Sequence, residues 1–132
     1  MYGMKQTCEL TGMNYETLKF YCNEGLIPNV QRDKNNRRIF SDNDIAWINS
    51  LTCLRKCGMS ISDMKEYLAL CLQWESTIPK RKDILEHKRK ALLTSINRLQ
   101  ESVDYIEWKQ GHYDDILSGK IAYYSNLNQV KV

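Results

Sequence analysis

Two cysteines, Cys53 and Cys57, have the spacing and the neighbours that make a thiol reactive. They stand four positions apart, so on a helix they share one face. Arg55 and Lys56 lie between them, and Ser60 is the predicted start of another helix, whose N-terminal end attracts negative charge. Nearby positive charge lowers the pKa of a thiol, and the thiolate is the nucleophile. Both are candidates for covalent chemistry, against the usual role of a free cysteine as a small buried hydrophobe.

A second group of residues has the chemistry of nucleic-acid binding. Residues 14–40 hold five Lys or Arg against three acidic residues, a net charge of +2 in a chain whose net charge is only +3. Basic side chains bind phosphates, and polar side chains beside them contact base edges. The candidate DNA contacts are Tyr15, Glu16, Lys19, Phe20, Tyr21, Arg32, Arg37, Arg38, Arg55 and Lys56. The alternatives are a solvated charged surface and, for Tyr15 and Phe20, a place in the core.

Two short helices are predicted to position the first of these residues. Asn14 is a natural N-cap and Gly25 a natural stop, which predicts a helix over residues 15–24. A shorter helix is predicted over residues 3–11, and Gly12 lies in the turn between the two. This pattern is typical of a helix-turn-helix, whose second helix enters the DNA major groove.

A hairpin and two more helices are predicted next. Residues 33–36 are strong turn residues between two short segments, which predicts a β-hairpin in the position of a wing. Capping signals at Ser41 and Ser60 predict one helix after each, and Gly58 between the helices predicts a sharp corner.

The last predicted element is a long helix that needs a partner. Apolar residues recur at heptad spacing, and the candidate dimer interface is Ile78, Leu85, Leu92, Ile96, Leu99, Val103 and Ile106. Some thirty residues of helix, about 45 Å, are too long for one small core to cover. Residues 78–100 have a net charge of +5 and residues 101–132 a net charge of −2, which favours antiparallel pairing.

We therefore expect a mainly α fold: a winged helix-turn-helix domain over residues 1–75, a dimerisation helix forming an antiparallel coiled coil over 76–110, and a short tail over 111–132. Five cysteines, an odd number, argue against a disulfide framework, and we expect mostly buried free thiols. The chain has neither a run of about 18 apolar residues nor a signal peptide, so we expect a cytoplasmic protein without membrane contact. No cofactor is indicated.

Taken together, the motifs resemble the MerR family of bacterial transcription regulators. They are GMNYETLKFYCNEGLIP, R-x4-RRIFS, the corner CGMSISDM and the terminal helix, and they span nearly the whole chain. The resemblance implies a homodimer that binds a palindromic operator in double-stranded promoter DNA and distorts it so that RNA polymerase can use the promoter.

By position, Lys19 matches the usual Arg of the family's L-R-Y-Y motif, Phe20 and Tyr21 match its aromatic pair, and Arg38 matches the wing Arg. The sequence departs from the family at Glu16, where a basic residue is common; a carboxylate there repels phosphate or accepts from a cytosine amine. Cys22 replaces a common acidic residue.

The effector class follows from what the chain contains. Metal-sensing members carry cysteines at the end of the dimer helix, whereas this chain has none after Cys71, so no metal site is expected. Drug-sensing members add a large ligand domain, for which the tail is too short. The region around Cys53 is similar to small regulators that answer aldehydes, electrophiles or nitrosative stress through one Cys, and modification there would add bulk inside a packed helix.

Two alternatives remain. One is a regulator that senses a small ligand non-covalently, with inert thiols. The other is a cytosolic thiol enzyme that uses Cys53 or Cys57 with His87 as base. We do not favour the enzyme, because nothing in the sequence brings His87 beside either thiol and no Gly-rich phosphate loop or carboxylate pair is present.

Overall fold

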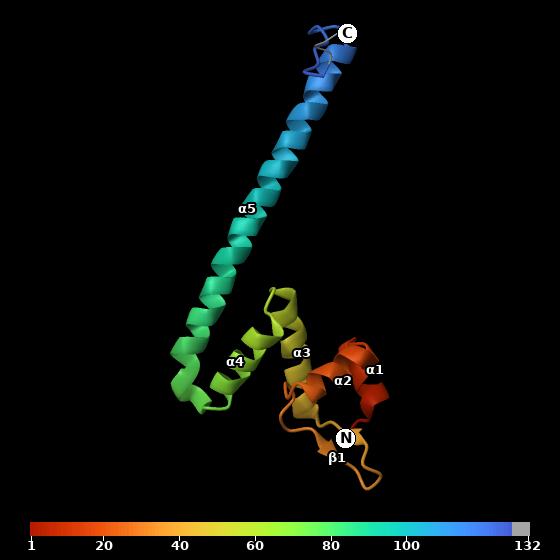
Figure 1. Cartoon of the computed structure of the whole chain (residues 1–132), viewed down its shortest axis with the longest axis vertical. Coiled ribbons are helices and arrows are strands. Elements are labelled where there is room, and N and C mark those ends of the chain that lie inside the picture. Colours follow the sequence, from red (N-terminus) through yellow and green to blue (C-terminus); the bar gives the residue numbers. More distant parts are fainter. Residues whose placement is uncertain (128–132) are drawn as a thin grey trace. The chain divides into compact units, whose positions relative to one another are not determined.

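The computed structural model describes residues 1–127, and its elements follow the predicted order (Figure 1). They are α1 (Met4–Thr11), α2 (Tyr15–Asn23), β1 (Gln31–Arg32), β2 (Arg38–Ile39), α3 (Asp42–Lys56), α4 (Ile61–Cys71), a 3-10 helix η1 (Trp74–Thr77) and α5 (Ile78–Leu117). The chain divides into a first unit, Met1–Lys90, and a second unit that begins at Ala91. The expected mainly α architecture is confirmed. Among the described residues, no helix combines the length and apolarity that a membrane crossing needs.

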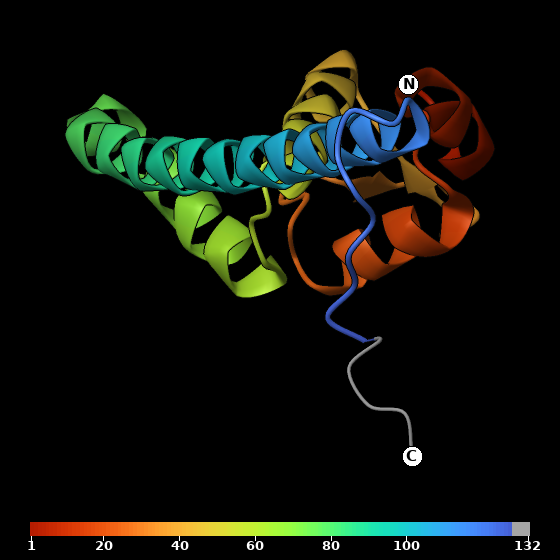
Figure 2. The same cartoon turned by 90° about the horizontal axis from the view of Figure 1, so that it is seen from above.

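Helices α1 and α2 form the predicted helix-turn-helix. Gly12 ends α1 with a φ of 73°, and its N–H donates to the carbonyl of Cys8. Two residues later the Asn14 carboxamide accepts from the Thr17 N–H at 2.8 Å and caps α2. The turn between the helices is therefore fixed at both ends, and α1 and α2 lie side by side in both views of the chain (Figure 1, Figure 2).

Strands β1 and β2 form the wing as an antiparallel hairpin, in the register Gln31–Ile39 and Arg32–Arg38. Asn36 takes the left-handed conformation in the turn, with a φ of 60°. The backbone of Tyr2 exchanges two hydrogen bonds of 2.8 Å with Phe40 and so forms an antiparallel bridge. The sequence did not predict this bridge. The N-terminus therefore lies along the wing.

Reciprocal capping boxes start α3 and α4. At Ser41 the hydroxyl accepts from the Asp44 N–H at 3.1 Å, and the Asp44 carboxylate accepts from the Ser41 N–H at 2.9 Å. Ser60 and Asp63 repeat the arrangement at the start of α4, after a corner in which Gly58 has a φ of 85°.

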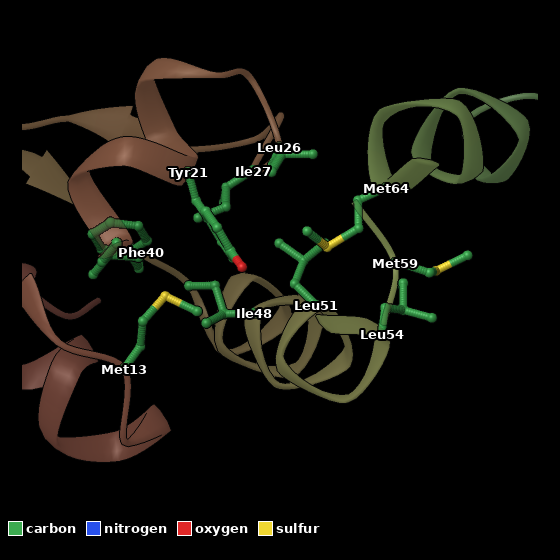
Figure 3. Packing of buried hydrophobic residues seen from close by; sticks show 11 residues of the cluster. Met13, Tyr21, Leu26, Ile27, Phe40, Ile48, Leu51, Leu54, Met59 and Met64 are labelled. Atoms are coloured by element: carbon green, nitrogen blue, oxygen red, sulfur yellow. The ribbon is translucent and has the colours of Figure 1, made fainter. Parts of the chain in front are cut away.

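The core of the first unit lies among α2, α3, the wing and the start of α4. Phe40, Leu18, Ile48 and Leu51 are completely buried. Figure 3 shows Phe40 of the wing, Tyr21 of α2 and residues of α3 converging on one cluster, with Met64 of α4 at its other side. The buried apolar side chains fix the wing and α2 to α3.

The first turns of α5 belong to the first unit and contact α3 and α4 there. The guanidinium of Arg81 donates to the Trp74 carbonyl, which ties η1 to α5. Ile84 packs against the core. The Lys88 ammonium lies 3.6 Å from the Asp63 carboxylate. A movement of this part of α5 must therefore disturb α3 and α4.

Helix α5 ends at Leu117, so the predicted helix end at residue 110 is wrong. The helix continues through Gly111, and Trp108 stacks on His112 across that position with ring centroids 5.4 Å apart. The end lies at Gly119, which has a φ of 80° and is followed by a bond from the Lys120 N–H to the Asp115 carbonyl at 2.9 Å.

Candidate nucleic-acid interface

Helix α2 has one buried and one exposed face. Leu18 points into the core and is completely buried, whereas Tyr15 and Phe20 are 51% and 46% exposed. Glu16 and Lys19 are exposed beside them. The exposed face holds four of the candidate DNA contacts, and both aromatic residues that fitted a core role equally well are outside the core.

The assignment of Tyr21 as a DNA contact is wrong. Its side chain is only 2% exposed, and Figure 3 shows its ring inside the hydrophobic cluster beside Ile48. The residue lies on the same side of α2 as Leu18, three positions earlier. Tyr21 therefore supports α2 from within and offers almost no surface to a nucleic acid.

Hydrogen bonds within the wing hold its basic residues. The Arg38 guanidinium donates to the Asn23 carboxamide oxygen at 2.7 Å, which joins the wing to the end of α2. The Arg32 guanidinium donates to the Asn36 carbonyl at 2.9 Å. The Asp33 carboxylate accepts from the Arg37 N–H at 2.9 Å and closes the turn. The side chains of Arg32 and Arg38 are thus held in place, and the backbone of Arg37 is fixed in the turn.

A groove of about 680 Å³ brings several predicted residues together. We call it the basic groove; it is lined by Gly3, Met4, Lys5, Gln6, Tyr15, Arg32, Asp33, Arg37, Arg38 and Ile39. Four of these side chains are cationic and one is anionic. Such an excess of positive charge in a concave surface favours phosphate.

Lys5 was not among the predicted residues. The sequence offers one signal for it, an exposed lysine in the first turn of α1, but only the tertiary structure shows that this turn faces the wing.

A second groove, of about 510 Å³, lies between α2 and the corner that joins α3 and α4. Glu16, Phe20 and Arg55 are among its lining residues. Lys56 is exposed at the end of α3 but is not part of this lining. The ammonium of Lys65 is 2.6 Å from the Glu24 carboxylate, which links α4 to the end of α2. Arg55 lines the same groove as Glu16 and Phe20 of the exposed face of α2.

The thiols are more accessible than expected. None of the five cysteines is fully buried, and Cys53 is exposed, so the expectation of mostly buried thiols is wrong. Burial raises the pKa of the Cys22 thiol, although Arg38 and Arg32 oppose the effect, and burial also raises the pKa of Cys8. These two thiols stay protonated at neutral pH and are poor nucleophiles.

Cys53 opens into a pocket of about 410 Å³ within the first unit. We call it the thiol pocket; it is lined by Trp47, Asn49, Ser50, Cys53, Leu54, Tyr67, Cys71 and Leu85, from α3, α4 and α5. Cys57 is half-buried at the end of α3 and is not part of the lining. The expectation that a group attached to Cys53 would be forced into a packed core is therefore wrong, because the thiol faces open space.

The predicted interface residues of α5 are exposed in the single chain. The seven residues at heptad spacing are exposed by between 40% for Leu92 and 67% for Leu99. No residue of α5 is buried. An apolar row of this length on a helix leaves a surface that another helix can cover.

Comparison with known proteins identifies the family. The model of the MerR HTH family of regulatory proteins matches residues 2–71. An HTH-type transcriptional regulator of Haemophilus influenzae is 35% identical over 112 residues, which cover 85% of this chain and 83% of the relative. The HTH-type transcriptional regulator AdhR of Bacillus subtilis is 34% identical over 91 residues, 69% of this chain and 65% of AdhR.

Solved structures agree. HiNmlR, a MerR family regulator lacking the sensor domain and bound to promoter DNA, superimposes with a TM-score of 0.73 at 33% identity, over 89% of this chain and 93% of HiNmlR. A MerR family transcriptional regulator from Listeria monocytogenes gives a TM-score of 0.78 at 31% identity, over 91% of both chains. The winged helix-turn-helix fold with a long C-terminal helix is thus confirmed, and the chain belongs to the MerR family of helix-turn-helix regulatory proteins.

Proposed function

We propose that this regulator binds promoter DNA as a homodimer and changes transcription when Cys53 is modified. The observation that carries the DNA-binding part is the basic groove beside the exposed face of α2. In a helix-turn-helix protein the second helix reads the major groove while neighbouring elements bind the backbone. HiNmlR, which shares the fold, was solved bound to promoter DNA.

The proposed roles follow from exposure and charge. Glu16 and Lys19 meet base edges, and the basic groove, with Lys5, Arg32, Arg37 and Arg38, meets phosphates. Tyr15 and Phe20 contact sugar or bases beside them. Arg55 and Lys56, exposed at the end of α3, add phosphate contacts on the other side of α2.

The dimer is proposed from α5. Its exposed heptad residues need a partner helix, and the basic start and acidic end of the helix complement each other when two copies run antiparallel. Two DNA-reading units on one dimer then match a palindromic operator, because the symmetry of the protein mirrors that of the site. In this proposal the dimer distorts the promoter DNA, and RNA polymerase can then use the distorted promoter.

The switch is proposed from the thiol pocket. Leu85 of α5 shares this pocket with Cys53 of α3 and Tyr67 of α4, so an added group at Cys53 fills the space where the dimer helix meets the DNA-reading unit. Filling that space changes how α5 rests on α3 and α4, and with it the spacing of the two recognition helices in the dimer. The physical cause of the switch is then the filling of the thiol pocket, and not the overpacking of a core.

DNA binding is tested by fluorescence anisotropy with a duplex from the chain's own promoter region and with a scrambled duplex, over a range of salt concentrations. We expect tighter binding to the promoter duplex and a log-log salt slope of several units, because phosphate contacts release counterions. Equal affinity for both duplexes, or no binding, would contradict the proposal.

The switch is tested in a promoter-reporter assay under aldehyde or nitrosating stress. We expect the Cys53→Ala protein to bind its operator but to lose the response, whereas Cys8→Ala, a matched thiol outside the pocket, keeps it. The same pocket also suits a ligand that binds without covalent chemistry. A full response from Cys53→Ala would favour that second function.

A further inference from the structure

We propose that Glu16 determines part of the operator sequence, because its carboxylate accepts a hydrogen bond from the 4-amino group of a cytosine in each half-site. The inference rests on the proposed binding of α2 in the major groove and names a base that the operator presents there. It concerns a carboxylate on the exposed face of α2, where the proposed partner is a polyanion.

The structure gives every other acidic residue between positions 14 and 63 a partner within the chain. The pairs are Glu24 with Lys65, Asp33 with N–H groups of the wing turn, Asp42 with the Tyr2 hydroxyl, Asp44 with Ser41, and Asp63 with Ser60. Within residues 1–127, no hydrogen bond or ion pair reaches the Glu16 carboxylate, although Arg55 lines the same groove. Contacts within the chain therefore do not account for Glu16.

Glu16 has the position of a residue that reads bases. It is the second residue of α2, and in a helix-turn-helix protein the N-terminal residues of the second helix contact base edges. The cap of this helix is made by another residue, Asn14, whose carboxamide accepts from the Thr17 N–H at 2.8 Å. The exposed carboxylate of Glu16 is thus available to the DNA.

The chemistry of a carboxylate selects the base. An ionised carboxylate only accepts hydrogen bonds, so phosphate oxygens repel it. In the major groove, guanine presents two acceptors, and thymine presents one acceptor and a methyl group. Adenine has an amine beside the acceptor N7, which repels the second carboxylate oxygen. Cytosine presents its amine without a neighbouring acceptor on the same base, so it is the best partner for Glu16.

The neighbours of Glu16 on α2 strengthen this preference. Tyr15 and Phe20 are 51% and 46% exposed, and Phe20 lines one groove together with Glu16. Against DNA, these rings exclude water, and a carboxylate that loses water without gaining a donor is costly. Lys19, exposed three residues later, has the complementary preference for O6 and N7 of guanine. A cytosine paired with or next to a guanine therefore suits both side chains.

The experiment measures the base preference of the whole chain. DNase I footprinting of the chain's own promoter region defines the operator. Competition anisotropy at one salt concentration then gives the relative affinity for each symmetric single-base-pair variant. We expect one position at which cytosine is preferred by roughly 5- to 150-fold per half-site, the range that one base pair contributes. Glu16→Ala should lose the preference at this position alone. Glu16→Gln should shift it towards adenine, because a carboxamide pairs with N6 and N7 of adenine.

Two controls isolate the contact. Pyrimidin-2-one in place of that cytosine removes the 4-amino group; it should weaken binding of the native chain and leave that of Glu16→Ala unchanged. Glu66→Gln removes the same charge from an exposed residue outside both grooves and should keep every base preference. The helix dipole also favours an acid in the first turn, but this effect acts on stability, which urea denaturation of Glu16→Ala measures separately.

Three outcomes would overturn the inference: an unchanged base preference in Glu16→Ala, a variant that binds all duplexes more tightly by one common factor, or a preference that depends on Glu16 but is for a base other than cytosine. If any of these occurs while the native chain still prefers its promoter duplex to the scrambled one, the proposed DNA binding stands and only this contact is wrong. A native chain without that preference refutes the proposed DNA binding itself.

Discussion

Helices α2 and α3 bury apolar residues within one chain, whereas helix α5 leaves its apolar residues exposed. Leu18 of α2 and Ile48 and Leu51 of α3 are completely buried within one chain, whereas no residue of α5 is buried. The first unit closes a hydrophobic core by itself, and α5 carries an apolar row that is still open to solvent. The first unit thus closes its own core, and the proposed partner helix would cover the apolar row of α5.

Their charges differ as well. The first unit gathers cations from α1 and the wing into one groove, whereas α5 distributes them along its first half. Clustered cations favour a polyanion, and a gradient along a helix favours an antiparallel copy of the same helix. The comparison assigns DNA binding to one part and pairing to the other, and five changes test that assignment.

The largest effect is expected from two charges in the apolar row. Leu92→Asp together with Leu99→Asp should convert the dimer into monomers of 15.6 kDa, because buried unpaired carboxylates are too costly for a coiled coil, and operator binding should be lost with it. Light scattering checks the mass and anisotropy checks binding. Thr94→Asp with Asn97→Asp adds the same charge at positions outside the row and should leave the dimer intact; if the first variant stays dimeric, the assigned interface is wrong.

Next is the core of the first unit. Phe40 is completely buried between the wing and α3, so Phe40→Ala should lower the free energy of unfolding by about 3–5 kcal/mol. Leu117→Ala, at a side chain that is 85% exposed at the end of α5, should change it by less than about 0.5 kcal/mol. Urea denaturation followed by circular dichroism measures both. Similar losses in the two variants would contradict the contrast between the closed core and the open helix.

The third change separates the two sets of cations. Arg38→Ala should weaken binding to every duplex and make the log-log salt slope shallower by about one unit, since one phosphate contact is lost. Arg98→Ala removes a cation from α5 and should leave the slope as it is. A slope that is unchanged in the Arg38 variant means that Arg38 contacts no phosphate.

The fourth test replaces a serine by alanine once in the first unit and once in α5. Ser60 caps α4 through the Asp63 N–H, so Ser60→Ala should cost about 1 kcal/mol of unfolding free energy. The Ser102 hydroxyl donates to the Arg98 carbonyl in the interior of α5, where alanine is the better helix former, so Ser102→Ala should be neutral or slightly stabilising. A loss at Ser102 equal to that at Ser60 would mean that the Ser60 cap has no special role.

The smallest effect concerns pH. The backbone and hydroxyl of Ser60, and then Lys88, lower the pKa of the Asp63 carboxyl in the folded chain. A carboxyl whose pKa is depressed by folding stabilises the protein above its unfolded pKa, and the contribution is lost as the pH falls through the folded pKa. Unfolding measured at neutral pH and at successively lower pH should show this loss in the native chain and a smaller loss in Asp63→Asn. Identical pH profiles would show that the carboxylate adds nothing.

Local chemistry was sufficient to predict most of the secondary structure. The N-caps at Asn14, Ser41 and Ser60 and the left-handed glycines at Gly12 and Gly58 act within a few residues, so their spacing in the sequence is their spacing in space. The heptad row of α5 was readable for the same reason. The motif set also predicted the family.

Only the tertiary structure decided which residues meet and which are hidden. Tyr21 and Phe20 are adjacent aromatics, and packing against α3 buries the first and leaves the second exposed. Cys53 is exposed because the face of α3 that bears it opens into a pocket shared with α4 and α5. Lys5 joins the basic groove because the first turn of α1 and the wing line the same groove. Burial and long-range contact depend on every neighbouring element at once, so no local pattern could predict them.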